Sequence, residues 1–404
     1  MSAAVETAEV VIVGAGPAGS TLAALLAARG HDVVLVDRAA FPRDKTCGDG
    51  LTPRAIPVLA RLGLLPRLQA NGYRAIHGAR LIAADGDTWH MRFADYDLRL
   101  PDFGLVVPRL ELDELLRQHA VEQGARFLAT ADITRPLHGP AVIGVCGRRP
   151  DGPLTVQARL TVLATGAAIG LLRSFGILRT MPIGINAVRG YFAGVADLAD
   201  TFDFYFEHDL APGYAWIFPV SADRANVGLG MLRGARSGPP PDLRARLADF
   251  MQRQPRLRHA TPLGPLKSYP IRIDFPACPV VGDGFLVVGE AAGLVNPVTG
   301  EGIDLALESA EIAADAIHVA LALGDTTAHG LRSYARTLHR RYAGFFRGVR
   351  VLLRLATGPT ALGILIRRAQ RRPWLARTIA GINLGVASPW LAFSPRTWWE
   401  LLRG

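Results

Sequence analysis

EVVIVGAGPAG, residues 9–19, joins a short β-branched run to three closely spaced glycines. The run predicts a buried parallel strand, and the alanine- and leucine-rich residues after the glycines predict a helix. A second apolar run, 33–36, ends at Asp37, 23 residues after Gly14. Strand, glycine turn, helix, strand and terminal acid occur here in the order of a dinucleotide-binding βαβ unit.

Each glycine of this unit has a predicted physical role. Gly14 permits the tight turn, Gly16 lets the backbone approach a pyrophosphate, and Gly19 lets the helix pack closely against the strand. The helix N-terminus offers unpaired N–H groups to phosphate oxygens, and Asp37 is placed to bind ribose hydroxyls. The predicted nucleotide-binding residues are Gly14, Gly16, Pro17, Ala18, Gly19, Asp37 and Arg38.

The βαβ unit alone does not choose between NAD and FAD. A later predicted strand, 160–163, ends in ATGA, and another, 285–288, ends in a glycine and an acid. The second continues through NPVTGEG into a predicted helix from about Ile303, which gives another strand, glycine turn and helix N-terminus. Two such sites favour a long cofactor such as FAD; the alternative is that both turns serve packing only.

Four motifs, GAGPAG, FPRDKTCGDG, ATGA and GEAAGLVNPVTGEG, together resemble those of FAD-dependent oxidoreductases of the p-hydroxybenzoate hydroxylase type. Within that superfamily, KTCGDGLTPRA is most similar to the geranylgeranyl reductase family, as is YAWIFP followed after eight residues by GLG. That family includes prenyl reductases for chlorophyll side chains, archaeal lipids and menaquinone tails. The resemblance covers about residues 9–320 and implies FAD as the cofactor.

The resemblance also implies the fold class. We expect an α/β fold: a Rossmann-type FAD-binding domain of the glutathione reductase/p-hydroxybenzoate hydroxylase type, an inserted antiparallel-sheet substrate domain and a C-terminal helical segment. The predicted bounds are 1–75, 105–183 and 275–330 for the discontinuous FAD-binding domain, 76–104 and 184–274 for the substrate domain, and 331–404 for the Arg-rich helical segment.

Position by position, the resemblance implies that Cys47 and Gly48 lie close to the flavin and that Arg109 sits near the cofactor. Gly289 and Glu290 occupy a motif whose acid usually binds the ribityl chain. Asp is usual there, and Glu keeps the charge with one more methylene. Residues beside the isoalloxazine are implied to be Pro297, Gly300 and Gly302.

Cys47 is the candidate catalytic residue. It lies in a glycine-rich loop near Arg43 and Lys45, and nearby cations would favour its thiolate. The functional interpretation is a thiol near the flavin or the alkene that supplies the proton to the carbon that does not take the hydride. The alternative is a small residue that fills space where the chain crosses the cofactor.

The stretch GYAWIFP, 213–219, places aromatic rings at every second position. In a strand these rings share one face, which is either hydrophobic core or the wall of a cavity. An alternating strand at 201–207 is expected to pair with it and to double the aromatic lining. Its place in an insertion opposite the flavin favours the cavity, so the predicted substrate-binding residues are Tyr214, Trp216, Phe218 and Phe204.

Charge is unevenly distributed along the 404 residues. The segment 341–404 holds eleven arginines and one acid, Glu400. Its formal net charge of +10 is equal to that of the whole chain. Basic residues mixed with apolar runs favour an anionic membrane surface or an acidic electron carrier as the partner, rather than nucleic acid. A solvated Arg-rich helical face is the alternative.

The three cysteines are far apart and lack CxxC spacing, so neither a disulfide framework nor a metal site is expected. The first ten residues carry acids and lead into a strand, so no signal peptide is expected. We therefore expect a cytoplasmic protein, or one that is peripheral at the inner face of the membrane.

The favoured function is an FAD-dependent reductase that saturates C=C bonds of a prenyl chain, either a geranylgeranyl or an isoprenoid-quinone chain or a prenyl diphosphate. Hydride would come from reduced flavin, and NADPH or a reduced ferredoxin-like carrier would supply the electrons. The main alternative is a flavin-dependent monooxygenase that hydroxylates an aromatic or polyketide natural product. A halogenase is disfavoured because no lysine occurs between 46 and 266.

Overall fold

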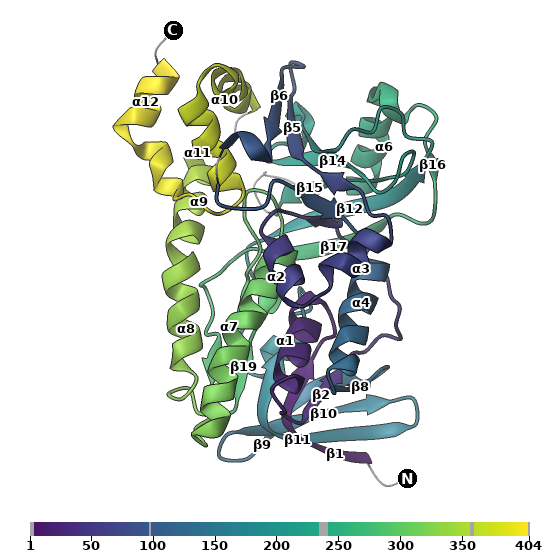
Figure 1. Cartoon of the computed structure of the whole chain (residues 1–404), viewed down its shortest axis with the longest axis vertical. Coiled ribbons are helices and arrows are strands. Elements are labelled where there is room, and N and C mark those ends of the chain that lie inside the picture. The colour runs from purple at the N-terminus through teal and green to yellow at the C-terminus, as the bar shows by residue number, and fades with distance from the viewer. Residues whose placement is uncertain (1–3, 97, 234–240, 356–358, 403–404) are drawn as a thin grey trace.

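The computed structural model describes residues 4–96, 98–233, 241–355 and 359–402. A mixed eight-stranded sheet forms one end of the molecule, near the N-terminus (Figure 1). Its central strands are parallel, and their side chains are buried because helices and loops cover both faces. Along the sheet these strands are β19 (Phe285–Val287), β11 (Gly152–Leu163), β1 (Ala4–Val13), β2 (Val33–Val36) and β8 (Arg126–Leu128).

Antiparallel strands complete this sheet beside the parallel ones. The first strand extends beyond the predicted 9–13, because its N-terminal half pairs in parallel with the long strand β11. That long strand also forms a hairpin, which the apolar pattern alone did not predict. The antiparallel strands are β9 (Asp132–His138), β10 (Val142–Arg149) and β18 (Val281–Gly282).

Three helices lie together on one face of this sheet, where α1 contacts both α4 and α7 (Figure 1). The turn before α1 is held by backbone contact: Gly14 has a φ of +110°, and a Cβ there would lie 2.3 Å from the carbonyl oxygen of Ala164. A Cβ on Gly19 would lie 1.8 Å from the Gly14 oxygen, so helix and turn approach as predicted. The helices are α1 (Pro17–Ala27), α4 (Arg109–Glu122) and α7 (Ile303–Ala322).

A second eight-stranded sheet lies at the other end of the molecule. It is antiparallel except where β13 runs parallel to β5. The predicted pairing of the two aromatic strands is confirmed, since β13 and β14 are antiparallel neighbours. Its strands are β5 (Gly78–Ala83), β6 (Thr88–Arg92), β12 (Gly184–Ala193), β13 (Thr201–Phe206), β14 (Gly213–Pro219), β15 (Ala225–Leu232), β16 (Thr261–Pro262) and β17 (Lys267–Arg272).

Helix α6 (Leu243–Arg253) covers one face of this second sheet. Asp242 caps it, because its carboxylate accepts the backbone N–H groups of Arg244 and Ala245 at 2.9 and 3.3 Å. Small elements join the two sheets: β3 (Gly50–Leu51), β4 (Ala75–Ile76), β7 (Gly104–Val106), α2 (Ala55–Arg61), α3 (Leu65–Ala70) and α5 (Gly170–Ser174).

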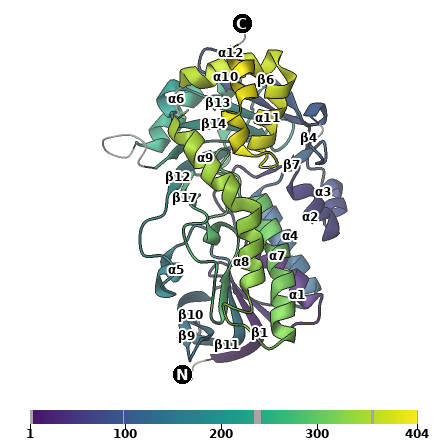
Figure 2. The same ribbon diagram turned by 90° about the vertical axis from the view of Figure 1, so that its left-hand side faces the viewer.

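The chain after α7 is helical, as predicted. It runs from the first sheet to the second and ends in a group of helices beside β5 and β6 (Figures 1 and 2). The fold class is that expected, whereas the domain bounds remain a proposal. The described elements are α8 (Arg332–Leu338), a π-helical turn (His339–Ala343), α9 (Gly344–Leu355), α10 (Pro359–Arg371), α11 (Pro373–Asn383), the 3-10 helix η6 (Pro389–Phe393) and α12 (Pro395–Leu402).

We predict that Gly19→Ala lowers the free energy of unfolding by at least about 2 kcal/mol, because the added methyl group meets backbone that cannot move away. Urea unfolding followed by circular dichroism measures this change. Gly344→Ala is the matched control, because a Cβ at Gly344 meets no atom within 4 Å. Equal stability of the Gly19 and Gly344 variants would contradict the close approach.

Candidate active site

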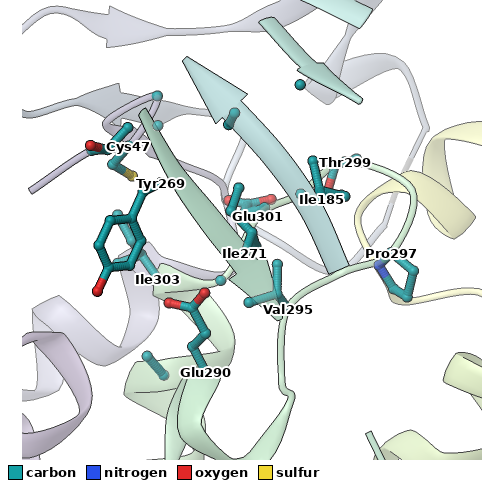
Figure 3. A pocket seen from close by; sticks show the side chains of 18 of the residues that line it. Cys47, Ile185, Tyr269, Ile271, Glu290, Val295, Pro297, Thr299, Glu301 and Ile303 are labelled. Atoms are coloured by element: carbon teal, nitrogen blue, oxygen red, sulfur yellow. The ribbon is translucent and has the colours of Figure 1, made fainter. Parts of the chain in front are cut away.

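A cavity of about 1190 Å³ connects the two sheets and reaches the C-terminal helices. This volume exceeds the roughly 300–1,000 Å³ usual for small-molecule sites, so it has room for a cofactor and part of a substrate. In Figure 3, side chains from separate segments surround one part of it: Cys47, Tyr269 of β17, Glu290 and Glu301.

The predicted nucleotide-binding residues are gathered at one end of the cavity. Its wall there includes Gly14, Gly16, Pro17, Ala18, Asp37 and Arg38. Gly19 is the exception: it does not line the cavity, and its role in the structure is the close approach of α1. The carboxylate of Asp37 accepts the backbone N–H of Ala15 at 2.8 Å, which fixes it at the end of β2.

Two guanidinium groups converge on the N-terminus of α1. A Cβ on Gly16 would lie 3.7 Å from Arg43 Nη2 and 3.8 Å from Arg109 Nη2. Both arginines bind the same buried carboxylate, Asp113: Arg109 through two hydrogen bonds of 2.6 Å and Arg43 through one of 2.8 Å. Arg43 also lies 3.8 Å from the carboxylate of Asp37. The guanidinium N–H groups that remain, together with the free helix N–H groups, fit a pyrophosphate. Sequence reasoning predicted Arg109 but not Arg43.

The second predicted motif lies elsewhere along the cavity. Glu290 lines it, and its carboxylate accepts from Lys45 Nζ and from the Arg272 backbone N–H, both at 3.1 Å. Gly289 does not line it; with a φ of +61°, its Cβ position lies 2.9 Å from the Cβ of Ala18. Gly289 therefore lets the motif approach α1, whereas the predicted residues Pro297, Gly300 and Gly302 do line the cavity.

Cys47 and Gly48 line the cavity between these two ends. Nearby cations favour the Cys47 thiolate as expected, because the charges of Arg109 and Lys45 lower the pKa of the thiol. Burial outweighs them, so the pKa of Cys47 lies above its ordinary value and the thiol keeps its proton at neutral pH. Lys45 also binds Glu290, and Arg43 binds Asp113.

A buried polar network holds the Cys47 loop against the second sheet. Asn226, on β15, donates its amide to the carbonyl of Cys47 and to the carboxylate of Asp49, both at 2.8 Å. Its amide oxygen accepts the indole N–H of Trp216 at 2.9 Å. Tyr191 donates its hydroxyl to the same Asp49 oxygen, and the Asp49 backbone N–H contacts Cys47 Sγ at 3.3 Å.

Sequence reasoning missed most of this network. Asp49 stands in the quoted CGDG motif, and its φ of +64° is a left-handed conformation that tightens the loop. Burial raises the pKa of Asp49 to about 6. Asn226 lies between YAWIFP and GLG, where only the register of β14 against β15 places it beside Phe218. The sequence signal that could have identified Asn226 is a polar residue opposite an aromatic residue in a buried pair of strands.

The aromatic strands form the wall predicted from their alternation. Tyr214, Trp216 and Phe218 all line the cavity, with successive ring centroids 6.1 Å apart. Phe204 lies 5.3 Å from both Tyr214 and Phe218, which doubles the lining. Ala215 and Ile217 point to the opposite face, into a core beneath α6. That these four aromatic residues bind substrate remains a prediction.

Further apolar residues extend this wall beyond the predicted four. The edge strand β6 and the turn after it contribute alternate side chains, and the C-terminal helices close one side of the cavity. The alternation in TWHMRF, residues 88–93, is a sequence signal for the side chains of β6 and its turn. The side chains of the C-terminal helices have no such signal, because their place in the wall depends on how the helices pack. These lining residues are Trp89, Met91, Phe93, Leu365, Ile366, Ile379 and Ile382.

Another acid faces the cavity beside the predicted Gly300 and Gly302. Glu301 accepts the backbone N–H of Thr52 at 3.2 Å, and Figure 3 places it among the residues that line the pocket. Burial, followed by the charge of Asp304, raises the pKa of Glu301 well above its ordinary value. Glu301 therefore keeps its proton to a higher pH than an exposed glutamate does.

We predict that Asp49→Asn removes a pH-dependent part of stability. In the folded chain the pKa of Asp49 is about 6, above the ordinary value of about 3.9, so its contribution is present at low pH and lost as pH rises through 6. Between pH 4 and 7, the free energy of unfolding of the wild type should fall by roughly 2–3 kcal/mol relative to the variant. Urea unfolding across this range measures the difference, and parallel curves would contradict it.

Comparison with known proteins identifies the family. Residues 7–347 match the family described as "FAD binding domain". A menaquinone reductase of Mycolicibacterium smegmatis is 32% identical over 97% of this chain and 95% of its own. A digeranylgeranylglycerophospholipid reductase of Methanopyrus kandleri is 32% identical over 81% of this chain and 84% of its own.

Among solved structures, a geranylgeranyl bacteriochlorophyll reductase-like protein of Thermoplasma acidophilum shares the fold. Its TM-score is 0.84, at 21% identity, over 99% of this chain and all of that one. The family match covers most of the chain, and the menaquinone and digeranylgeranylglycerophospholipid reductases match it over most of their own length. Both findings are consistent with the glycine-lined end of the cavity. The chain belongs to the geranylgeranyl reductase family of FAD-dependent oxidoreductases.

Proposed function

We propose that this protein is an FAD-dependent reductase that saturates C=C bonds of a prenyl chain. The observation that carries the proposal is the lining of the cavity, which includes the cationic end at α1, the half-buried thiol of Cys47 and the apolar aromatic wall. The relatives named menaquinone reductase and digeranylgeranylglycerophospholipid reductase support a substrate with a prenyl chain.

The residues at the cationic end fit FAD. The N-terminus of α1, Arg43 and Arg109 would hold the pyrophosphate, and Asp37 would hold the ribose of the adenosine half. Glu290 would bind the ribityl chain through the lone pairs that its two oxygens keep beyond their contacts to Lys45 and Arg272. Bound in reduced form, FAD supplies hydride-transfer chemistry to an alkene.

Cys47 is the proposed proton donor. Saturating a C=C bond adds a hydride to one carbon and a proton to the other, so an acid must face the second carbon. The thiol is protonated because burial disfavours its anion, and the Asp49 backbone N–H fixes the sulfur at 3.3 Å. The aromatic wall positions the chain beside the thiol and excludes water.

The electron donor, the partner surface and the location in the cell are also part of the proposal. NADPH or a small reduced carrier such as ferredoxin would reduce the flavin. A prenyl lipid or prenyl diphosphate would be the substrate, and the basic segment 341–404 would contact either an anionic membrane or an acidic carrier. The protein would act in the cytoplasm or at the inner face of the membrane.

The proposal is tested by anaerobic incubation of dithionite-reduced, FAD-loaded protein with menaquinone or geranylgeranyl diphosphate. Mass spectrometry should show a gain of two mass units for each saturated double bond, and dithionite makes the result independent of the natural electron donor. The main alternative, a monooxygenase, predicts instead an oxygen-dependent gain of one oxygen atom on an aromatic or polyketide. That outcome, or no reaction anaerobically, would overturn the reductase.

We predict that Cys47→Ala lowers the rate of alkene reduction at least about 100-fold while leaving FAD binding unchanged, because general acids contribute roughly 10²–10⁴-fold. Single-turnover reduction of the alkene and flavin absorbance measure the two quantities. Cys278→Ala is the matched control, since Cys278 is half-buried and outside the cavity lining. Full activity of the Cys47 variant would remove the thiol from the mechanism.

A further inference from the structure

The exposed aromatic residues gather at the C-terminal end of the fold. Among the described residues, the large aromatic side chains that are exposed are Trp390, Trp398 and Trp399, at 50, 52 and 58%. Leu391 beside them is 38% exposed. Trp390 and Leu391 belong to η6 and the other two to α12, and these elements contact each other. We call these four side chains the tryptophan face.

Arginine is the main charged residue in the sequence that carries the tryptophan face. From residue 359 to residue 402 there are six arginines and one acid, Glu400. Arg367 pairs with Asp85 and Asp87, and Arg372 lies 3.8 Å from Glu400. Arg396 lies on the same helix as two of the tryptophans, and its guanidinium stacks 4.6 Å from the ring centroid of Trp374. Tryptophan with arginine is the combination that favours the headgroup region of an anionic bilayer, where the ring sits at the interface and the cation meets lipid phosphate.

The cavity reaches the inner side of the same elements. Ala392 and Thr397 line it, and they lie in sequence directly beside Leu391 and Trp398 of the tryptophan face. Thr397 is buried and donates its hydroxyl to the Leu391 carbonyl at 2.5 Å, which ties α12 to η6. Thus η6 and α12 expose the tryptophan face on their outer side and form part of the cavity wall on their inner side.

The face suits contact with one leaflet. Across 4–96, 98–233, 241–355 and 359–402, no helix combines the length and apolar character needed to cross a membrane. Short helices with an apolar side and neighbouring arginines lie in the interface instead. Figures 1 and 2 show α12 at the outer limit of the molecule, away from the end that holds the first sheet.

We propose that the tryptophan face inserts into the headgroup region of an anionic lipid bilayer and that prenyl substrate enters the cavity from that bilayer beneath η6 and α12. The second half of this statement rests on the proposed function, whereas the first half rests on the exposed tryptophans and arginines alone. Docking would place the apolar end of the cavity at the membrane and the cationic end toward water.

Co-sedimentation of the FAD-loaded full chain with vesicles tests the docking. Vesicles of phosphatidylglycerol and phosphatidylcholine in equal parts should bind the wild type at least tenfold more strongly than pure phosphatidylcholine vesicles. The double variant Trp390→Ala, Trp398→Ala should lose at least tenfold of the anionic-vesicle binding. The matched control is Val319→Ala, Leu323→Ala, which removes side chains that are 54 and 76% exposed on α7 and at its C-cap, and it should bind as wild type.

Folding of each variant is checked by flavin absorbance and thermal unfolding, because exposed side chains should be removable without loss of either. Unchanged vesicle binding by the tryptophan variant would overturn the proposal, as would absence of binding by the wild type. A wild-type dimer that the tryptophan substitutions dissociate, with vesicle binding unaltered, would assign the face to a second copy of the chain and also overturn it. Light scattering after gel filtration detects that outcome.

A kinetic arm tests substrate entry separately. With menaquinone in anionic vesicles, the tryptophan variant should show a KM raised at least tenfold and an unchanged kcat. With menaquinone in detergent micelles, its KM should equal that of the wild type. Equal KM values in vesicles would overturn entry from the bilayer. Sedimentation needs no turnover, so failure of the reductase proposal would leave the docking result standing.

Discussion

The buried amide of Asn226 is the interaction on which the two halves of the site depend. It holds the loop that carries Cys47 against the strand that carries Trp216, and so joins the cofactor end of the cavity to the aromatic wall. All its hydrogen-bonding groups are used in a buried environment, where an unpaired polar group is costly. The distance between thiol and aromatic wall is therefore set by a side chain that itself faces neither solvent nor cofactor directly.

Charge in the site is arranged in compensated groups. The two arginines near α1 share Asp113, and Lys45 is matched by Glu290. Burial raises the pKa values of Cys47, Asp49 and Glu301, so each of these groups holds its proton to a higher pH than an exposed group of its kind. The result is a cavity with positive charge at the nucleotide end and acids that can hold protons elsewhere, as hydride addition to an unactivated alkene requires.

The sequence predicted what local backbone geometry dictates. Gly14 and Gly19 were assigned correctly because only glycine tolerates those contacts, and the alternating rings of GYAWIFP fixed one face of β14. The sequence predicted less about the features of the site that depend on tertiary packing. The effect of nearby cations on Cys47 was predicted in the right direction, but the burial that outweighs it depends on how the loop packs in the folded chain. Asn226 depends on strand register, and the contribution of the C-terminal helices depends on docking that no local pattern encodes.

The parallel pairing of β13 with β5 has a consequence for synthesis. The hairpin of β5 and β6 is made early, yet its partner β13 lies more than 100 residues later in the chain. A two-stranded hairpin is marginally stable alone, and closing such a long loop is slow. During synthesis, the apolar side chains of the hairpin therefore stay uncovered until β13 emerges, and surface exposed in this way favours aggregation.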